Sequence, residues 1–491
     1  TVSPNSPEAR DIAFHLHSYT NARKHLETGP LVIEKGDGIY VEDNQGKRYI
    51  EAMSGLWSVG LGFSEPRLVE AATRQMSKLP YYHTFSHRSH GPVIDLAEKL
   101  ISLAPLPMSK VYFTNSGSEA NDTALKLIWY RSNALGEPQR KKVIARQRGY
   151  HGVTIASASL TGLPNNHRSF DLPIANVLHT GSPHYWRSHQ PGESEEDFST
   201  RLATELEELI VAEGPDTIAA FFAEPLMGAG GVIVPPATYW EKIQPVLQKY
   251  GILLVADEVI CGFGRTGQMF GSETFGLKPD IMVMSKQLSS SYLPISALMV
   301  NERVFEPIAD ESDRIGVLGH GYTASGQPVA AAVALENLKI IEERDLVSHA
   351  REMGAHMHAG LASLKDHPLV GEVRGRGLIG AVELVADKSL EIPEAPSGKL
   401  GAAMNTILME KGLISRPMYD AMALCPPMIV TETEIDTIVE IMGEDHVMFG
   451  SDFPHPEGIG DPLSFVDRLD GISEEAKAKI MGGNLGRLVT V

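Results

Sequence analysis

Between about Lys110 and Ile295, short apolar runs alternate with longer helical patterns, and this alternation is the strongest constraint on the fold. The runs are VYFT (111–114), KVIA (142–145), TIAAFFAE (217–224), GILLVAD (251–257) and DIMVMS (280–285). Runs that are apolar on both faces and separated by helices are typical of parallel strands covered by helices. We therefore expect an α/β protein whose ligands collect beyond the carboxyl ends of the strands.

Composition limits the partners and the compartment. The 491 residues carry 43 Lys and Arg against 62 Asp and Glu, a formal net charge of −19. So acidic a surface argues against nucleic acid or an anionic membrane as the main partner. With only two cysteines, Cys261 and Cys425, neither a disulfide framework nor a cysteine-based metal site is expected. The absence of a membrane-length apolar run and of a signal-peptide pattern predicts a cytoplasmic protein.

Polar residues follow several of the expected strands, at the edge where a ligand would bind. Lys286 stands two residues beyond the apolar run 281–284, and Asp257 ends GILLVAD. The small residues 116–118 open a helix, and Tyr150 follows the KVIA strand. Taken singly, these features have ordinary explanations: a solvent-exposed lysine, two helix caps and a core tyrosine.

In combination, the four features suit one cofactor. A helix N-terminus with small residues can hold a phosphate, and an aromatic side chain can cover a ring. A buried carboxylate can keep a pyridine nitrogen protonated, and a lysine amine can form a Schiff base with an aldehyde. These are the groups that pyridoxal 5'-phosphate (PLP) requires. No G-x-G-x-x-G follows a strand, so a dinucleotide is not expected.

Longer motifs carry a resemblance to a known family. They are TNSGSEAND (114–122), RGYHG (148–152), AEP (223–225), DEVICGFGRTG (257–267), SKQLSSSYLPISA (285–297) and GYTASGQP (321–328). Over roughly residues 10–442 the chain resembles the class III aminotransferases, fold type I PLP enzymes that act on ω-amino acids and amines. The resemblance implies a large domain with a mostly parallel seven-stranded sheet and a small α+β domain.

The implied organisation divides the chain into four parts. Residues 1–60 would contribute to the small domain, 61–326 would form the large PLP-binding domain, and 327–442 would form the small C-terminal domain. Residues 443–491 would be an appended tail, because class III aminotransferases are expected to end soon after TETEIDTIVEIM (431–442).

The resemblance also implies roles for individual residues. Lys286 would carry the Schiff base and move the proton, and Asp257 would pair with the pyridine nitrogen. Tyr150 and Val259 would lie on the two faces of the ring. The remaining cofactor positions would be Gly117, Ser118, His151 and Glu224 of the same chain and Thr323 of a partner subunit. A homodimer, or a tetramer of two such dimers, is therefore implied.

Acceptor choice is expected to depend on two arginines. Family members that use 2-oxoglutarate commonly carry a glutamate after the AEP-type motif, which gates an arginine in the VRGxGL segment. Ala229 stands at that position here, so we expect Arg374 to be structural. In GLISRPMYD, Arg416 resembles the arginine of pyruvate-using members, expected on a flexible loop where it binds the acceptor carboxylate, or else a solvated loop residue. Trp57 would line the substrate pocket beside Tyr150, unless it is a core tryptophan.

The expected activity is PLP-dependent transfer of an amino group from a primary amine or ω-amino acid to a 2-oxo acid, with pyruvate giving alanine. A racemase or decarboxylase on the same scaffold is the alternative, because cofactor motifs do not fix the reaction type.

Three histidine pairs raise the question of a metal site. They are His15/His17, His87/His90 and His356/His358. No carboxylate set is expected beside any of them, so no metal is predicted.

The tail points to a different family. GEDHVMFGSDFPHPEG (443–458) resembles the end of an amidohydrolase barrel, in which Asp452 would be a metal ligand. A single βα unit cannot complete such a barrel or its site, so a metal-dependent amidohydrolase is the least favoured alternative. We expect the tail either to cover the small domain through the apolar residues 447–449 or to be poorly ordered.

Overall fold

The computed structural model describes residues 3–443, and the largest sheet in that part of the chain has seven strands in the order β4-β10-β9-β8-β7-β5-β6. The strands are β4 (Lys110–Thr114), β5 (Lys142–Arg146), β6 (Val177–Thr180), β7 (Ile218–Ala223), β8 (Leu253–Asp257), β9 (Ile281–Met284) and β10 (Ser296–Val300). All neighbours from β9 to β6 are parallel, whereas β10 runs antiparallel to both β9 and β4. The predicted mostly parallel sheet is confirmed.

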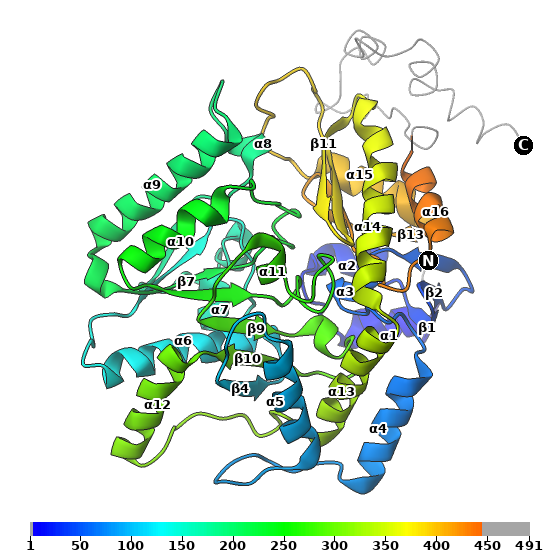
Figure 1. The fold of residues 1–491 in the computed structure, drawn as a ribbon. Coiled ribbons are helices and arrows are strands. Elements are labelled where there is room, and N and C mark those ends of the chain that lie inside the picture. The colour runs from blue at the N-terminus through cyan, green and yellow to red at the C-terminus, as the bar shows by residue number, and fades with distance from the viewer. Residues whose placement is uncertain (1–2, 444–491) are drawn as a thin grey trace, which may run out of the picture.

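Helices cover both faces of this sheet (Figure 1). Because strand side chains alternate between faces, Phe222 and Val255 pack with α6 and α12, while Phe221 and Leu254 pack with α9 and α10. The four helices are α6 (Gly117–Ala134), α12 (Glu302–Ile315), α9 (Glu195–Glu213) and α10 (Tyr239–Lys249). Both faces are apolar, which explains why the strands read as continuous apolar runs.

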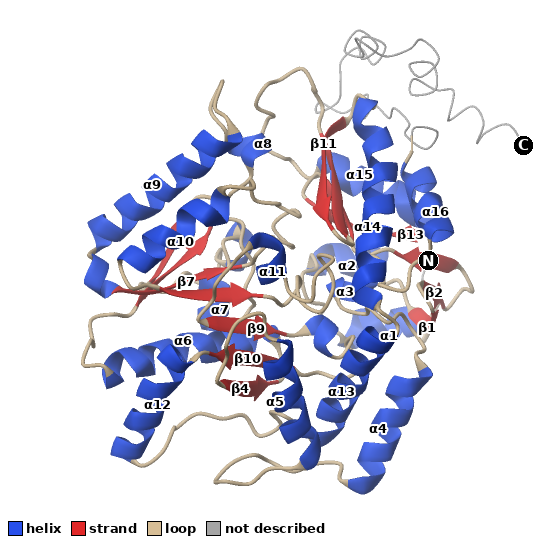
Figure 2. Cartoon of the chain, viewed as in Figure 1, coloured by secondary structure: helices blue, strands red, loops and turns tan. Residues whose placement is uncertain are grey.

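Two four-stranded sheets lie beside the large one (Figure 2). One has the order β1-β2-β3-β13, and the other has the order β11-β12-β15-β14. Their strands are β1 (Ile33–Asp37), β2 (Tyr40–Asp43), β3 (Arg48–Glu51), β13 (Leu413–Ile414), β11 (Val370–Arg376), β12 (Ile379–Leu384), β15 (Ala421–Leu424) and β14 (Arg416–Met418). Since β3 pairs in parallel with β13, the N-terminal hairpin shares a sheet with a segment from the other end of the chain.

The remaining helices include a long one, α13, at the start of the segment 327–442. They are α1 (Pro7–Phe14), α2 (Ala22–Thr28), α3 (Ser54–Trp57), α4 (Pro66–Lys78), α5 (Gly91–Leu103), α7 (Ile155–Leu160), α8 (Tyr185–Ser188), α11 (Gly271–Phe275), α13 (Pro328–Glu343), α14 (Leu346–Ala362), α15 (Lys399–Glu410) and α16 (Glu432–Met442). Within residues 3–443, none of the helices has the length and apolar character needed to cross a bilayer. Asp452 and residues 447–449 lie outside the described residues.

One local expectation is wrong. Arg416 does not lie on a flexible loop but begins β14, where it pairs with Ala423 of β15. The strand has three residues and contains Pro417, which is too short and too irregular for a strand pattern in the sequence. Proline is tolerated there because β14 is the edge strand of its sheet.

Candidate active site

A pocket enclosing about 510 Å³, part of it open to solvent, lies at the carboxyl ends of β7, β8 and β9. The lining residues are Gly117, Ser118, Asn121, Tyr150, His151, Gly152, Glu224, Asp257, Val259, Ile260, Ser285 and Lys286. The structure thus brings together the predicted cofactor residues of the chain, Thr323 excepted.

Lys286 enters the pocket from the turn that follows β9. Its backbone is left-handed, with φ +46°, which is uncommon for a residue with a side chain and is often found at functional sites. The Nζ atom donates a hydrogen bond to the Leu56 carbonyl at 3.3 Å. Burial lowers the pKa of Lys286 to about 8, the charge of Arg416 acts in the same direction, and Asp257 partly opposes both. Although the Lys286 side chain is only half-buried, a substantial fraction of the lysine amine is neutral near pH 8.

Asp257 is the last residue of β8 and is 2% exposed. Its Oδ2 atom lies 2.7 Å from His151 Nδ1 and accepts a hydrogen bond from Asn121 Nδ2 at 2.9 Å. The Oδ1 atom accepts from the Val259 backbone N–H at 3.1 Å. Three groups therefore fix the orientation of the carboxylate, and His151 acts by positioning it.

Asn121 is a site residue that the sequence reasoning missed. It lies within TNSGSEAND, one helical turn after Gly117 on α6, so both residues face the pocket. Its spacing from Gly117 was the available signal, since i and i+4 share a face of a helix.

The beginning of α6 forms the wall opposite the strand ends. Ser116 caps the helix by accepting the Glu119 N–H at 3.2 Å. A Cβ atom at Gly117 would lie 3.3 Å from a methyl group of Val259, so glycine lets the start of α6 approach Val259 closely. A Cβ at Gly152, whose φ is +129°, would lie 2.4 Å from Ser118 Oγ. Small residues at the N-terminus of a long helix suit a phosphate.

Glu224 connects two loops at the edge of the pocket. Its carboxylate accepts the Tyr150 N–H at 3.0 Å and the Gly228 N–H at 2.8 Å. Burial raises the pKa of Glu224 against the opposing effect of His151. Burial also raises the pKa of Tyr150, so the phenol that faces the pocket stays neutral. The loop of Ala229 is thereby held beside Tyr150.

Trp57, Ala229, Thr323 and Arg416 do not line this pocket. Trp57 is 1% exposed and belongs to an apolar cluster with Ile260, which does line it. Thr323 is exposed, and its carbonyl accepts a hydrogen bond from the Tyr81 hydroxyl at 2.8 Å. The substrate role of Trp57 and the cofactor role of Thr323 in a partner subunit remain predictions.

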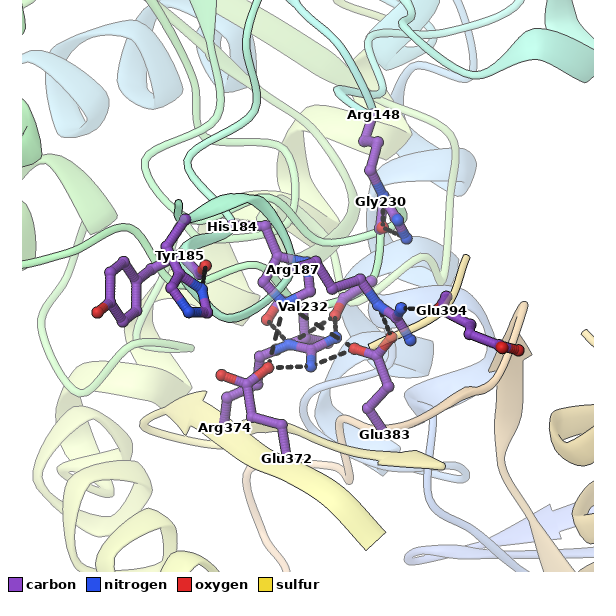
Figure 3. A network of polar contacts seen from close by, with 12 residues as sticks. Arg148, His184, Tyr185, Arg187, Gly230, Val232, Glu372, Arg374, Glu383 and Glu394 are labelled. Carbon is purple, nitrogen blue, oxygen red and sulfur yellow. Dashed lines mark hydrogen bonds and ion pairs between the residues drawn. The ribbon is translucent and has the colours of Figure 1, made fainter. Parts of the chain in front are cut away.

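Arg374 lies in a separate buried network of charged groups (Figure 3). Its Nε atom donates to the carbonyls of Gly231 at 3.1 Å and Val232 at 2.9 Å. Its Nη1 atom donates to Glu372 at 2.6 Å and also pairs with Glu383. The guanidinium thus fastens the loop after β7 to the hairpin β11–β12, which agrees with a structural role.

A family model described as aminotransferase class III matches residues 20–444. The chain belongs to the class III aminotransferases. It is 50% identical over 430 residues to gamma aminobutyrate transaminase 1, mitochondrial, from Solanum lycopersicum, covering 87% of this chain and 84% of that protein. It is also 50% identical over 416 residues to vanillin aminotransferase from Capsicum chinense, covering 84% and 91%.

Solved structures agree with this family. The ω-transaminase from Pseudomonas jessenii in complex with PMP is 64% identical and superposes with a TM-score of 0.88, covering 89% of this aminotransferase and 96% of that chain. A structure described as a transaminase with L-ala is 73% identical, with a TM-score of 0.83, and covers 84% and 97%. An amidohydrolase model matches residues 431–489, most of which lie outside the described residues.

Class III aminotransferases use PLP, and the pocket fits it. Lys286 presents a partly neutral amine, the start of α6 presents small residues to a phosphate, and Asp257 presents an oriented carboxylate. Bound PLP supplies an aldehyde for the lysine and a ring that accepts electrons. With PLP bound, the Asp257 carboxylate would hold a proton on the ring nitrogen, and the neutral Lys286 amine would take and return the substrate proton.

Proposed function

We propose that this aminotransferase transfers the amino group of a primary amine or an ω-amino acid to pyruvate, giving alanine. The proposal rests on the different states of two arginines, Arg374 and Arg416. An acceptor with a second carboxylate needs a second cation that is free to bind it, and the geometry of these arginines supports an acceptor with a single carboxylate.

Arg374 is already fully engaged. It is 8% exposed, and two backbone carbonyls and two carboxylates occupy its nitrogens. Releasing it to a substrate would break its ion pairs with Glu372 and Glu383, and breaking a buried ion pair costs about 3–5 kcal/mol. Ala229 provides no carboxylate that could pair with the Arg374 guanidinium and act as its gate. Arg374 therefore disfavours 2-oxoglutarate as acceptor.

Arg416 is available. Within residues 3–443 no hydrogen bond or ion pair of its guanidinium is found, and it is half-buried at the edge of its sheet. Its charge contributes to the lowered pKa of Lys286, so it lies within electrostatic reach of the reacting amine. One free guanidinium near the lysine suits an acceptor with one carboxylate, such as pyruvate.

The named relatives are compatible with this assignment. γ-Aminobutyrate is an ω-amino acid, vanillin aminotransferase takes its name from an aldehyde substrate, and one solved relative is described as a transaminase with L-ala. We propose that Thr323 of a partner subunit completes the cofactor site in a homodimer. A cytoplasmic location remains a prediction, since several plant relatives are named as mitochondrial or chloroplastic enzymes.

A half-reaction assay tests the acceptor. The PLP form of the enzyme is mixed with L-alanine or with L-glutamate, and the loss of the visible absorbance of the cofactor is followed in a single turnover. We expect alanine to convert the cofactor and glutamate to convert it much more slowly. Equal rates for the two amino acids would contradict the assignment of pyruvate, because each amino acid reports on its own 2-oxo acid.

A further inference from the structure

A cluster of three histidines and one aspartate lies in the N-terminal segment, outside the pocket described above. Asp11 Oδ2 lies 2.6 Å from His17 Nε2 and 3.0 Å from His25 Nε2, and Asp11 Oδ1 lies 3.1 Å from His15 Nδ1. The imidazole rings of His15 and His17 are 4.3 Å apart, and those of His17 and His25 are 4.2 Å apart. We call these four residues the N-terminal His cluster.

The cluster corrects the expectation that no carboxylate accompanies the His15/His17 pair. Asp11 lies on α1 and His15 is the residue that caps the C-terminus of this helix, one turn later. The spacing D-x3-H-x-H was the sequence signal. His25 comes from α2, so only the fold could add it to the group.

We propose that the N-terminal His cluster is a binding site for a divalent transition metal ion, with zinc as the best-suited ion. Asp11, His15 and His17 offer two imidazole nitrogens and a carboxylate oxygen, and His25 Nε2, 3.0 Å from Asp11 Oδ2, offers a third nitrogen; nitrogen and oxygen donors of this kind suit tetrahedral zinc. The donor atoms of Asp11, His15 and His17 all lie within 4.8 Å of one another. Zinc–nitrogen bonds of about 2.0–2.1 Å require donors roughly 3.3 Å apart, and the Asp11 oxygens lie 2.6–3.1 Å from the three histidine nitrogens, so each of these separations needs to grow by only a few tenths of an ångström.

The surroundings of the carboxylate support the site. The Asp11 side chain is only 21% exposed, and both of its oxygens face imidazole nitrogens. In a second cluster of possible ligands, His184 with Glu372 and Glu383, the carboxylates are already paired with Arg374 and Arg187. Among the described residues, arginine competes for the second cluster but not for the first.

Metal binding here would act next to the active site. The ion would join α1 to α2, and the loop between these helices contains Tyr19. The Tyr19 hydroxyl accepts a hydrogen bond from Asn166 Nδ2 at 2.6 Å, and Tyr19 contributes to the raised pKa of Tyr150. The segment that the metal would fix therefore reaches the tyrosine of the pocket.

Zinc titration of the tag-free, dialysed holoenzyme by isothermal calorimetry tests the site. We expect one zinc ion per chain with micromolar or tighter affinity. His17→Gln should weaken it at least about tenfold, the loss known for lesser changes around zinc sites. The matched control is His356→Gln, because His356 Nε2 lies 2.6 Å from Asp436 Oδ1 in a comparable pair away from the cluster. This control should bind zinc as the parent does.

A second variant guards against misfolding. His15 is largely exposed, with a side chain 64% accessible, so His15→Gln should keep the fold and the cofactor while weakening zinc binding. Limited proteolysis provides an independent readout, since zinc should protect the N-terminal segment of the parent but not of His15→Gln. Absence of saturable binding in the parent, or unchanged affinity in both cluster variants, or an equal loss in His356→Gln, would overturn the proposal.

Discussion

The lowered pKa of Lys286 predicts how fast the apoenzyme takes up PLP at different pH values. Only the neutral amine attacks the aldehyde. With a pKa of about 8, Lys286 is neutral in roughly one molecule in ten at pH 7, against roughly one in a few thousand for an ordinary lysine. Burial of Lys286 is the main cause of the lowered pKa, so the larger neutral fraction is a property of the folded protein and not of PLP.

Because the pKa of Lys286 is lowered, reconstitution with PLP should reach its full rate at a lower pH than it would with an ordinary lysine. As pH rises from 7 to 9 the neutral fraction of Lys286, and with it the rate of reconstitution, should increase about tenfold and then level off. An unperturbed lysine would gain about a hundredfold over the same interval and continue to rise toward pH 10. The assay is stopped-flow absorbance of apoenzyme mixed with excess PLP in buffers of constant ionic strength.

Two controls separate the lysine from the cofactor. Nα-acetyl-lysine with the same PLP solutions reports the pH dependence of the aldehyde itself. Arg416→Gln removes a charge that lowers the pKa of Lys286, so its plateau should move to higher pH. A parent rate that rises without a plateau to pH 10, in parallel with acetyl-lysine, would refute the account of a desolvated amine.

Three further predictions follow from the same contacts. Asp257→Asn should retain the fold but lose most transamination in single-turnover kinetics, because an amide does not favour a protonated ring nitrogen; full activity would mean that another group does so. Arg416→Ala should lower kcat/KM for pyruvate by about 10–100-fold, as expected for a lost charge-assisted bond of roughly 1.5–3 kcal/mol, and should lower kcat/KM for an uncharged amine much less. An equal loss for both substrates would mean that Arg416 only supports the structure of the edge strand β14. Glu383→Gln should reduce the free energy of unfolding in urea by about 3–5 kcal/mol, because it leaves the guanidinium of Arg374 buried with one carboxylate fewer. An unchanged midpoint of urea unfolding would show that the network of Figure 3 adds nothing to stability.

The sequence revealed the sheet where its strands are apolar on both faces. The runs that became β4, β5, β7, β8 and β9 were recognised as apolar runs between helical patterns, and Asp257 and Lys286 were found because they stand at or just beyond the ends of such runs. β6 and β10 were not recognised individually. VLHT (177–180) is short and half polar, and SALMV (296–300) follows a motif of small residues without a clear break. Their places in the sheet depend on pairing, which has no local signal.

Contacts between distant segments were the other limit. Arg416 was assigned to a loop because a three-residue edge strand leaves no pattern. The carbonyls that bind Arg374, those of Gly231 and Val232, lie more than a hundred residues away in the chain. His25 joins Asp11 only through the packing of α2 against α1. In each case a titratable side chain could be read from the sequence, but the residues that satisfy it could not.

The central claim is that Lys286 is the residue through which this aminotransferase uses PLP. The most direct measurement is the turnover of Lys286→Ala with an ω-amino acid and pyruvate, alongside the visible spectrum of the purified variant. We expect transamination to fall by orders of magnitude, because both the attachment point and the proton carrier are lost, while the rest of the pocket still holds PLP non-covalently. Near-parental transamination by Lys286→Ala would contradict the account.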